Sequence, residues 1–127
     1  MHSLIVITLL GPPVPKKAGR AALRANGRPY VFSPTALKII EARESIRAMV
    51  NFRPFNAPYN VACKLTVTFY VLTMPYNKPD IDNLTTFVLD AVTGSLISDN
   101  ALVVELHAMK LYDAMNPRTD ITLELLH

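Results

Sequence analysis

Two carboxylates lie two residues apart where a strand-like run gives way to a helical pattern. Asp80 and Asp82 stand in the run Lys78-Pro-Asp-Ile-Asp-Asn83. Residues two apart within a helix face opposite sides, but at a helix start the first residue is still extended, so its carboxylate can turn beside the second. Two converging carboxylates repel each other unless a cation or a shared proton neutralises them. The run therefore indicates a site for a hard divalent cation such as Mg²⁺.

The hydrophobic pattern predicts one domain over residues 1–127 of the α/β (α+β) class. Residues 61–73 alternate apolar and polar side chains, which predicts a half-exposed strand. Residues 80–92 predict a helix that ends near Gly94 and buries Ile81, Leu84, Val88 and Ala91. The full order is β-α-β-α-β-β, a mixed sheet of about four strands packed with two helices. The remaining elements are strands at 4–10, 101–112 and 119–126, a short extra strand at 28–32, a helix from Ser33-Pro34 to about 51, and a loop at 11–26.

Composition restricts the class of protein. No stretch approaches the roughly 18 apolar residues that a membrane span requires. Cys63 is the only cysteine, so an internal disulfide is excluded and a reducing cytoplasm fits best. Its place on the apolar side of a predicted strand favours a core residue over a nucleophile.

Charge is unevenly distributed along the chain, although the net charge is only +3. Residues 16–53 hold nine basic and two acidic side chains, whereas residues 80–127 hold eight acidic and two basic ones. A basic half beside an acidic cluster suits a polyanion held against a metal-binding site. The alternative is a chance asymmetry on the surface of a protein with no such partner.

Asp99 and Asn100 supply a second polar pair, directly before a predicted strand. One topology brings Asp99 or Asn100 beside Asp80 and Asp82, because functional groups gather where strands and helices end. Two structural alternatives stay open: Asp80 simply caps the helix, and Asp99-Asn100 simply forms a turn. An EF-hand is excluded because Thr85 occupies its glycine position. The histidines lack zinc spacing, and no glycine loop typical of a nucleotide or other small-molecule cofactor is present.

The acidic run, together with Leu89–Val92 and Asp99–Val103, resembles the RusA family of Holliday junction resolvases (crossover junction endodeoxyribonucleases). The resemblance covers most of the chain in element order, and residues 78–112 carry its specific part. It implies a small bacterial or phage homodimer in the cytoplasm that binds four-way DNA junctions and nicks them symmetrically with Mg²⁺ or Mn²⁺. By carry-over, Asp80 and Asp82 would be metal ligands, and Asn83 would be the polar residue that follows them.

This chain departs from the family pattern at two positions. The family commonly has Asp-Asp where this chain has Asp99-Asn100, and often has a lysine at the position of Thr86. Either Asp99 substitutes as the third ligand, or metal binding is weakened, or activity is lost. The last outcome is the alternative function: a catalytically impaired protein that binds junctions. Lys78 and Lys110 are the candidates to supply the positive charge that the family has at the position of Thr86.

We predict metal-dependent phosphodiester hydrolysis in recombination and repair. Metal would be held by Asp80, Asp82 and Asp99, with Asn100 and Lys78 as further catalytic candidates. Five basic residues would position the DNA backbone without reading bases: Lys16, Lys17, Arg20, Arg24 and Arg28. The exposed face of the helix at 80–92, including Phe87, is the candidate dimer interface.

Overall fold

The structure is a computed structural model that describes residues 3–17, 20–32, 35–50 and 57–126. Two helices and six strands follow one another, with a 3-10 turn at Asn100–Leu102 before β5. The strands and helices are β1 (Ser3–Leu10), β2 (Arg20–Leu23), β3 (Pro29–Phe32), α1 (Ala36–Val50), β4 (Cys63–Val71), α2 (Ile81–Val92), β5 (Val103–Tyr112) and β6 (Arg118–Leu125). The predicted start of the first helix at Ser33-Pro34 lies outside the described residues.

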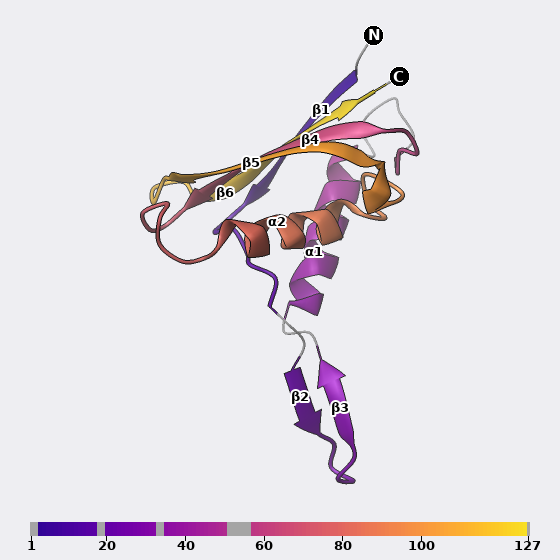
Figure 1. The fold of residues 1–127 in the computed structure, drawn as a ribbon, viewed down its shortest axis with the longest axis vertical. Coiled ribbons are helices and arrows are strands. Elements are labelled where there is room, and N and C mark those ends of the chain that lie inside the picture. The colour runs from indigo at the N-terminus through magenta and orange to yellow at the C-terminus, as the bar shows by residue number, and fades with distance from the viewer. Residues whose placement is uncertain (1–2, 18–19, 33–34, 51–56, 127) are drawn as a thin grey trace.

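Four strands form one mixed sheet in the order β1-β6-β4-β5. β6 pairs antiparallel with β1 and with β4, whereas β4 and β5 are parallel. The parallel pair follows from α2, which carries the chain back along the sheet between the two strands. Figure 1 shows both helices on one face of the sheet, with the other face uncovered. The predicted mixed four-stranded sheet with two helices is confirmed.

The core lies between the helices and the alternating strands. Side chains of β4 are buried at every second position, as the alternation predicts. The prediction for α2 was wrong at two positions: Ile81 is exposed, and Phe87 is buried. Phe87 shares a groove with Ala42 and Met49 because α1 packs along that side of α2. Phe87 therefore cannot belong to an exposed dimer interface on this helix.

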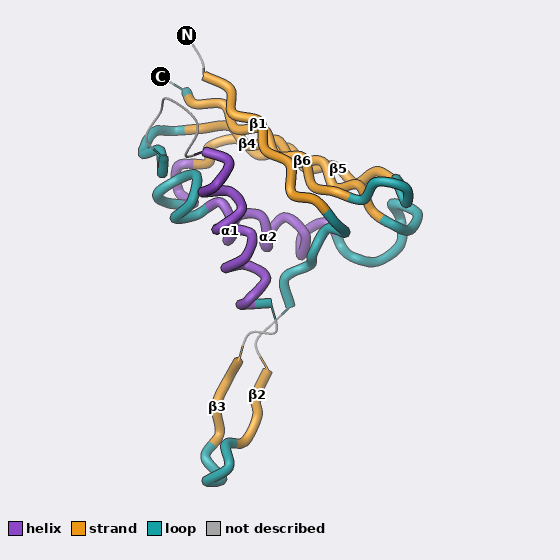
Figure 2. The backbone as a smooth tube through the Cα atoms, turned by 180° about the vertical axis from the view of Figure 1, so that it is seen from behind, coloured by secondary structure: helices purple, strands orange, loops and turns teal. Residues whose placement is uncertain are grey.

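A two-stranded hairpin stands apart from this body. β2 and β3 pair antiparallel, and the turn between them places Gly27 at a φ of 82°, where a side chain would be strained. Figures 1 and 2 show the hairpin projecting away from the sheet and helices. The predicted loop at 11–26 was therefore wrong for Arg20–Leu23, and we call residues 20–32 the β2–β3 arm. Among the described residues, no helix is long and apolar enough to cross a membrane.

Leu84 anchors α2 to the sheet, since its side chain is fully buried in the core. The Leu84→Ala variant is expected to lose about 2–5 kcal/mol of unfolding free energy, because the transfer term and the cavity left behind both contribute. Urea denaturation monitored by circular dichroism measures this loss. A loss below about 1 kcal/mol would contradict the packing described, and the exposed Leu37→Ala variant on α1 is the matched control.

Candidate functional site

Asp80 and Asp82 stand where the chain leaves the loop after β4 and enters α2. Asp80 is the N-cap residue, with extended backbone angles (φ −70°, ψ 142°), and its carbonyl accepts the first helical bond from the amide of Leu84 at 3.1 Å. Its side chain makes no capping bond to the helix. The alternative in which the Asp80 carboxylate only caps the helix is therefore wrong. The carboxylate is free for another cation or donor.

Lys78 supplies a cation to this carboxylate. Its Nζ lies 2.8 Å from Oδ1 and 2.9 Å from Oδ2 of Asp80. The hydrogen bond to Asp80 and the negative charges of Asp80 and Asp82 raise the pKa of the Lys78 ammonium. Asp80 is therefore the direct partner of the Lys78 ammonium, and the charge of Asp82 makes a smaller contribution to the raised pKa. The Lys78 side chain is 84% exposed, so the ammonium can leave without breaking the core.

Asp82 and Thr86 form the exposed side of the first turns of α2. Within the described part of the chain, the carboxylate of Asp82 accepts a local bond from the amide of Asn83 at 2.9 Å. The hydroxyl of Thr86 donates to the carbonyl of Asp82 at 2.9 Å. The Thr86 hydroxyl therefore has its hydrogen-bond acceptor within the helix, and this residue supplies no charge to the site.

Lys110 fixes the loop that leads to the carboxylates. Its Nζ lies 2.8 Å from the carbonyl oxygen of Asn77 and 2.5 Å from that of Pro79. The structure thus ties the end of β5 to the residues directly before Asp80. Lys110 thus holds the loop that precedes Asp80, whereas Lys78 contacts the Asp80 carboxylate itself.

Asp99 and Asn100 lie at the opposite end of α2. The helix has twelve residues, about 18 Å at 1.5 Å per residue, and it separates them from Asp80 and Asp82. The carboxylate of Asp99 accepts from the amide of Ala101 at 2.8 Å, and Asn100 accepts from the hydroxyl of Thr93. The expectation that Asp99 or Asn100 joins Asp80 and Asp82 within one chain is therefore wrong. Over the described ranges, no group of three or more His, Cys, Asp or Glu side chains is placed to hold a metal.

The five basic residues predicted to bind DNA are not equivalent. The Lys16 ammonium is paired with Asp90 on α2 at 2.5 Å. Lys17, Arg24 and Arg28 are exposed, and the guanidinium of Arg24 lies 4.7 Å from the ring centre of Tyr30. Arg20 begins β2, and its side chain is outside what the structure describes. The arm therefore presents Arg24 and Arg28 at its far end, beside the turn at Gly27.

The donor set at Asp80 and Asp82 fits a hard cation. Mg²⁺ in proteins is commonly bound by one or two carboxylates, with water and substrate phosphate oxygens completing the shell. Both carboxylates are accessible at the surface, and that of Asp80 already pairs with the ammonium of Lys78. Two such ligands can hold a metal that a phosphate also contacts.

Comparison with known proteins gives one family. The family model described as Endodeoxyribonuclease RusA matches residues 11–124. This span contains the arm, both helices and the carboxylates at the start of α2. No protein among curated sequences matches the chain.

Proposed function

Because the chain belongs to the RusA endodeoxyribonuclease family, we propose that it is a Mg²⁺-dependent or Mn²⁺-dependent endonuclease that resolves four-way DNA junctions. The observation that supports the proposal is the Lys78 ammonium bound to Asp80 at the start of α2, with Asp82 in the first turn of the same helix. Family membership supports nuclease activity in general.

Asp80 and Asp82 would hold the metal, and Lys78 would bind the scissile phosphate. A bound divalent metal polarises the phosphate and lowers the pKa of an attacking water. Lys78 has a second role in this scheme, because its ammonium must leave Asp80 when a metal takes its place. The released Lys78 ammonium would then offset the negative charge of the scissile phosphate.

The Lys78→Met variant tests this exchange. Metal affinity is expected to rise by up to about fivefold, because the competing ammonium is removed and an exposed ion pair competes only weakly. Nicking is expected to fall, since the phosphate no longer has its lysine. Mn²⁺ titration followed by electron paramagnetic resonance measures the affinity. Weaker Mn²⁺ binding in the variant would contradict the exchange, and Lys38→Met on α1 is the control.

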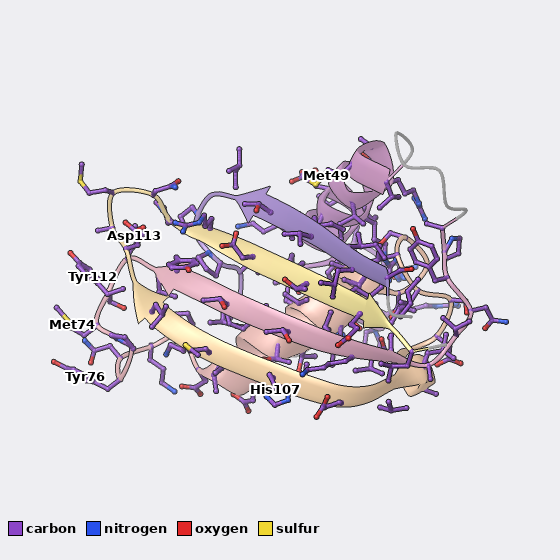
Figure 3. All side chains as sticks on the ribbon, turned by 90° about the horizontal axis from the view of Figure 1, so that it is seen from above. Met49, Met74, Tyr76, His107, Tyr112 and Asp113 are labelled. Carbon is purple, nitrogen blue, oxygen red and sulfur yellow. The ribbon has the colours of Figure 1, made fainter. Side chains whose placement is uncertain are left out.

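In a homodimer, Asp99 of the partner subunit would lie near Asp80 and Asp82. β5 is an edge strand of the sheet, and its apolar side chains are unusually exposed, with Val104 at 63% and Met109 at 55%. Unpaired edges with exposed apolar residues are sites of association. Figure 3 shows His107 on β5, the edge strand in question.

The direction of pairing decides which residues meet. Two copies of β5 related by a two-fold axis run antiparallel, so the start of one strand lies beside the end of the other. The end of β5 holds Lys110, which contacts the residues before Asp80. The partner subunit's Asp99, a few residues before the start of its own β5, would then approach the Asp80–Asp82 pair. Two such sites would nick two strands symmetrically.

The arm would hold the DNA backbone. Joint replacement of Arg24 and Arg28 by alanine is expected to weaken junction binding and to flatten its dependence on salt. Removal of one phosphate contact lowers the slope of log K against log salt concentration by about 0.9, so the change is expected to be up to about 2. Fluorescence anisotropy at several salt concentrations measures the slope. An unchanged slope would contradict the proposal that Arg24 and Arg28 on the arm contact DNA phosphates.

Incubation of the protein with a labelled four-way junction and Mg²⁺ tests the proposed function. Paired nicks in two opposite strands are expected, with little cleavage of a matched duplex. The alternative is a junction-binding protein without cleavage, which predicts a gel shift and no nicks until Asn100 is replaced by aspartate. Cleavage of flap or single-stranded DNA in preference to junctions would instead point to another class of DNA substrate.

A further inference from the structure

The segment that enters the arm lies against α2. The chain leaves β1 at Gly11, whose amide donates to the carbonyl of Pro117 at 3.1 Å. Five residues later, the amide of Lys16 donates to the carbonyl of Asn83 at 2.9 Å. Asn83 directly follows Asp82. The entrance to the arm is therefore attached to the same helical turn that carries the candidate metal ligand.

Lys16 makes a second contact further along α2. Its ammonium pairs with the carboxylate of Asp90 at 2.5 Å, and both side chains are partly buried. Asp90 lies seven residues after Asn83, which is about 10 Å along the helix axis. One contact would leave the segment free to pivot. Two contacts on different turns fix both its position and its direction on α2.

Asp90 also holds the element that follows the arm. The Nε of Arg43 on α1 donates to the carbonyl of Asp90 at 2.9 Å. This carbonyl belongs to the last turn of α2, where carbonyl groups lack helical partners. The segment before the arm and the helix after it thus both contact Asp90: Lys16 binds its carboxylate, and Arg43 donates to its carbonyl.

We propose that Lys16 and Asp90 are positioning residues that hold the base of the β2–β3 arm in one register on α2. The proposal rests on the proposed function for its consequence, because the arm would carry DNA and α2 would carry the metal ligands. A displacement of about 1 Å at a reacting centre can cost about 100-fold in rate. The pair therefore acts on cleavage, through the placement of the scissile phosphate relative to Asp80 and Asp82.

Charge exchange tests the pair. The variants are Lys16→Met, Asp90→Asn and the double exchange Lys16→Asp/Asp90→Lys, with Lys38→Met as the control for loss of a lysine from the surface. Nicking of a four-way junction is measured in a single turnover with protein in excess of its Kd. Each single variant is expected to be about tenfold slower or more, and the double exchange is expected to return to within about threefold of the unaltered protein.

A direct contact between Lys16 and DNA would give a different pattern. Lys16→Met would then weaken binding and flatten its salt dependence, Asp90→Asn would cleave at the normal rate, and the exchange would not rescue. That pattern overturns the proposal. So does a change below twofold in both single variants.

A second measurement does not depend on cleavage. Nitroxide labels at Asn26→Cys on the arm and Thr85→Cys on α2, in a Cys63→Ala background, report the distance between the two elements by double electron–electron resonance. A narrow distribution that broadens in Lys16→Met and Asp90→Asn and narrows again in the double exchange supports the proposal. An equal width in all four proteins overturns it. If the protein does not nick junctions, the proposed function fails, and the label distances alone decide the positioning role.

Discussion

Replacement of Asp82 by asparagine is expected to slow nicking of a four-way junction by about 100-fold or more, with junction binding retained. Loss of a group that only supports a metal ligand typically costs about 10–100-fold, and loss of a ligand should cost at least the upper end of that range. The side chain keeps its size, and an asparagine Oδ1 can still accept the 2.9 Å bond from the Asn83 amide. Removal of a negative charge beside the phosphate should tighten binding slightly.

The measurement is a time course of nicking with protein in excess of DNA, alongside a binding titration in the absence of metal. Glu44→Gln is the matched control, because it removes one carboxylate charge from an exposed position on α1. A rate within threefold of the unaltered protein would exclude Asp82 as a metal ligand. Loss of binding together with loss of nicking would indicate unfolding instead, which circular dichroism distinguishes.

A mixed dimer is expected to recover activity that each parent variant lacks. One chain carries Asp82→Asn and the other carries Asp99→Asn. If each site takes Asp80 and Asp82 from one chain and Asp99 from its partner, both changes fall in one site of the mixed dimer. The second site is then unaltered. Nicking of one strand is expected to return to about half of the normal rate, at least about 50-fold above either altered homodimer.

Two affinity tags allow the mixed dimer to be purified after co-expression. If each site were built within a single chain, both sites of the mixed dimer would carry one change and no activity would return. Failure to isolate any dimer would contradict the β5 interface as well. The Val104→Asp/Met109→Asp variant checks that interface separately, because charges at the open edge strand should leave a monomer without nicking activity.

Much of the fold could be predicted from the sequence because its patterns are local. The alternation before residue 72 predicted β4, and the apolar spacing after Asp80 predicted α2. In the arm, β3 lies within the strand predicted at 28–32, whereas β2 was missed, since its four residues include two alanines and show no apolar alternation. Phe87 was assigned to the wrong side because only the packing of α1 decides how wide the buried stripe of α2 becomes.

Some features of the candidate site could likewise be predicted from local sequence, whereas others could not. The placement of Asp80 and Asp82 at the start of α2 could be predicted from the sequence, and the structure adds the contact of the Lys78 ammonium with Asp80. The distance to Asp99 is also implied by the sequence, since a helix of twelve residues between two strands must place its ends apart. The pairing of Lys16 with Asp90 spans 74 positions, and no periodic pattern connects residues so far apart. Only the folded chain shows it.

Direct measurement of Mn²⁺ binding tests the metal site without reference to DNA. Electron paramagnetic resonance counts free Mn²⁺ as it is titrated into the protein and into the Asp80→Asn variant. We expect saturable binding at one site per chain, weakened at least about tenfold by the substitution. Equal binding by the two proteins, or no saturable binding by the unaltered protein, would contradict the claim that these carboxylates form a metal centre.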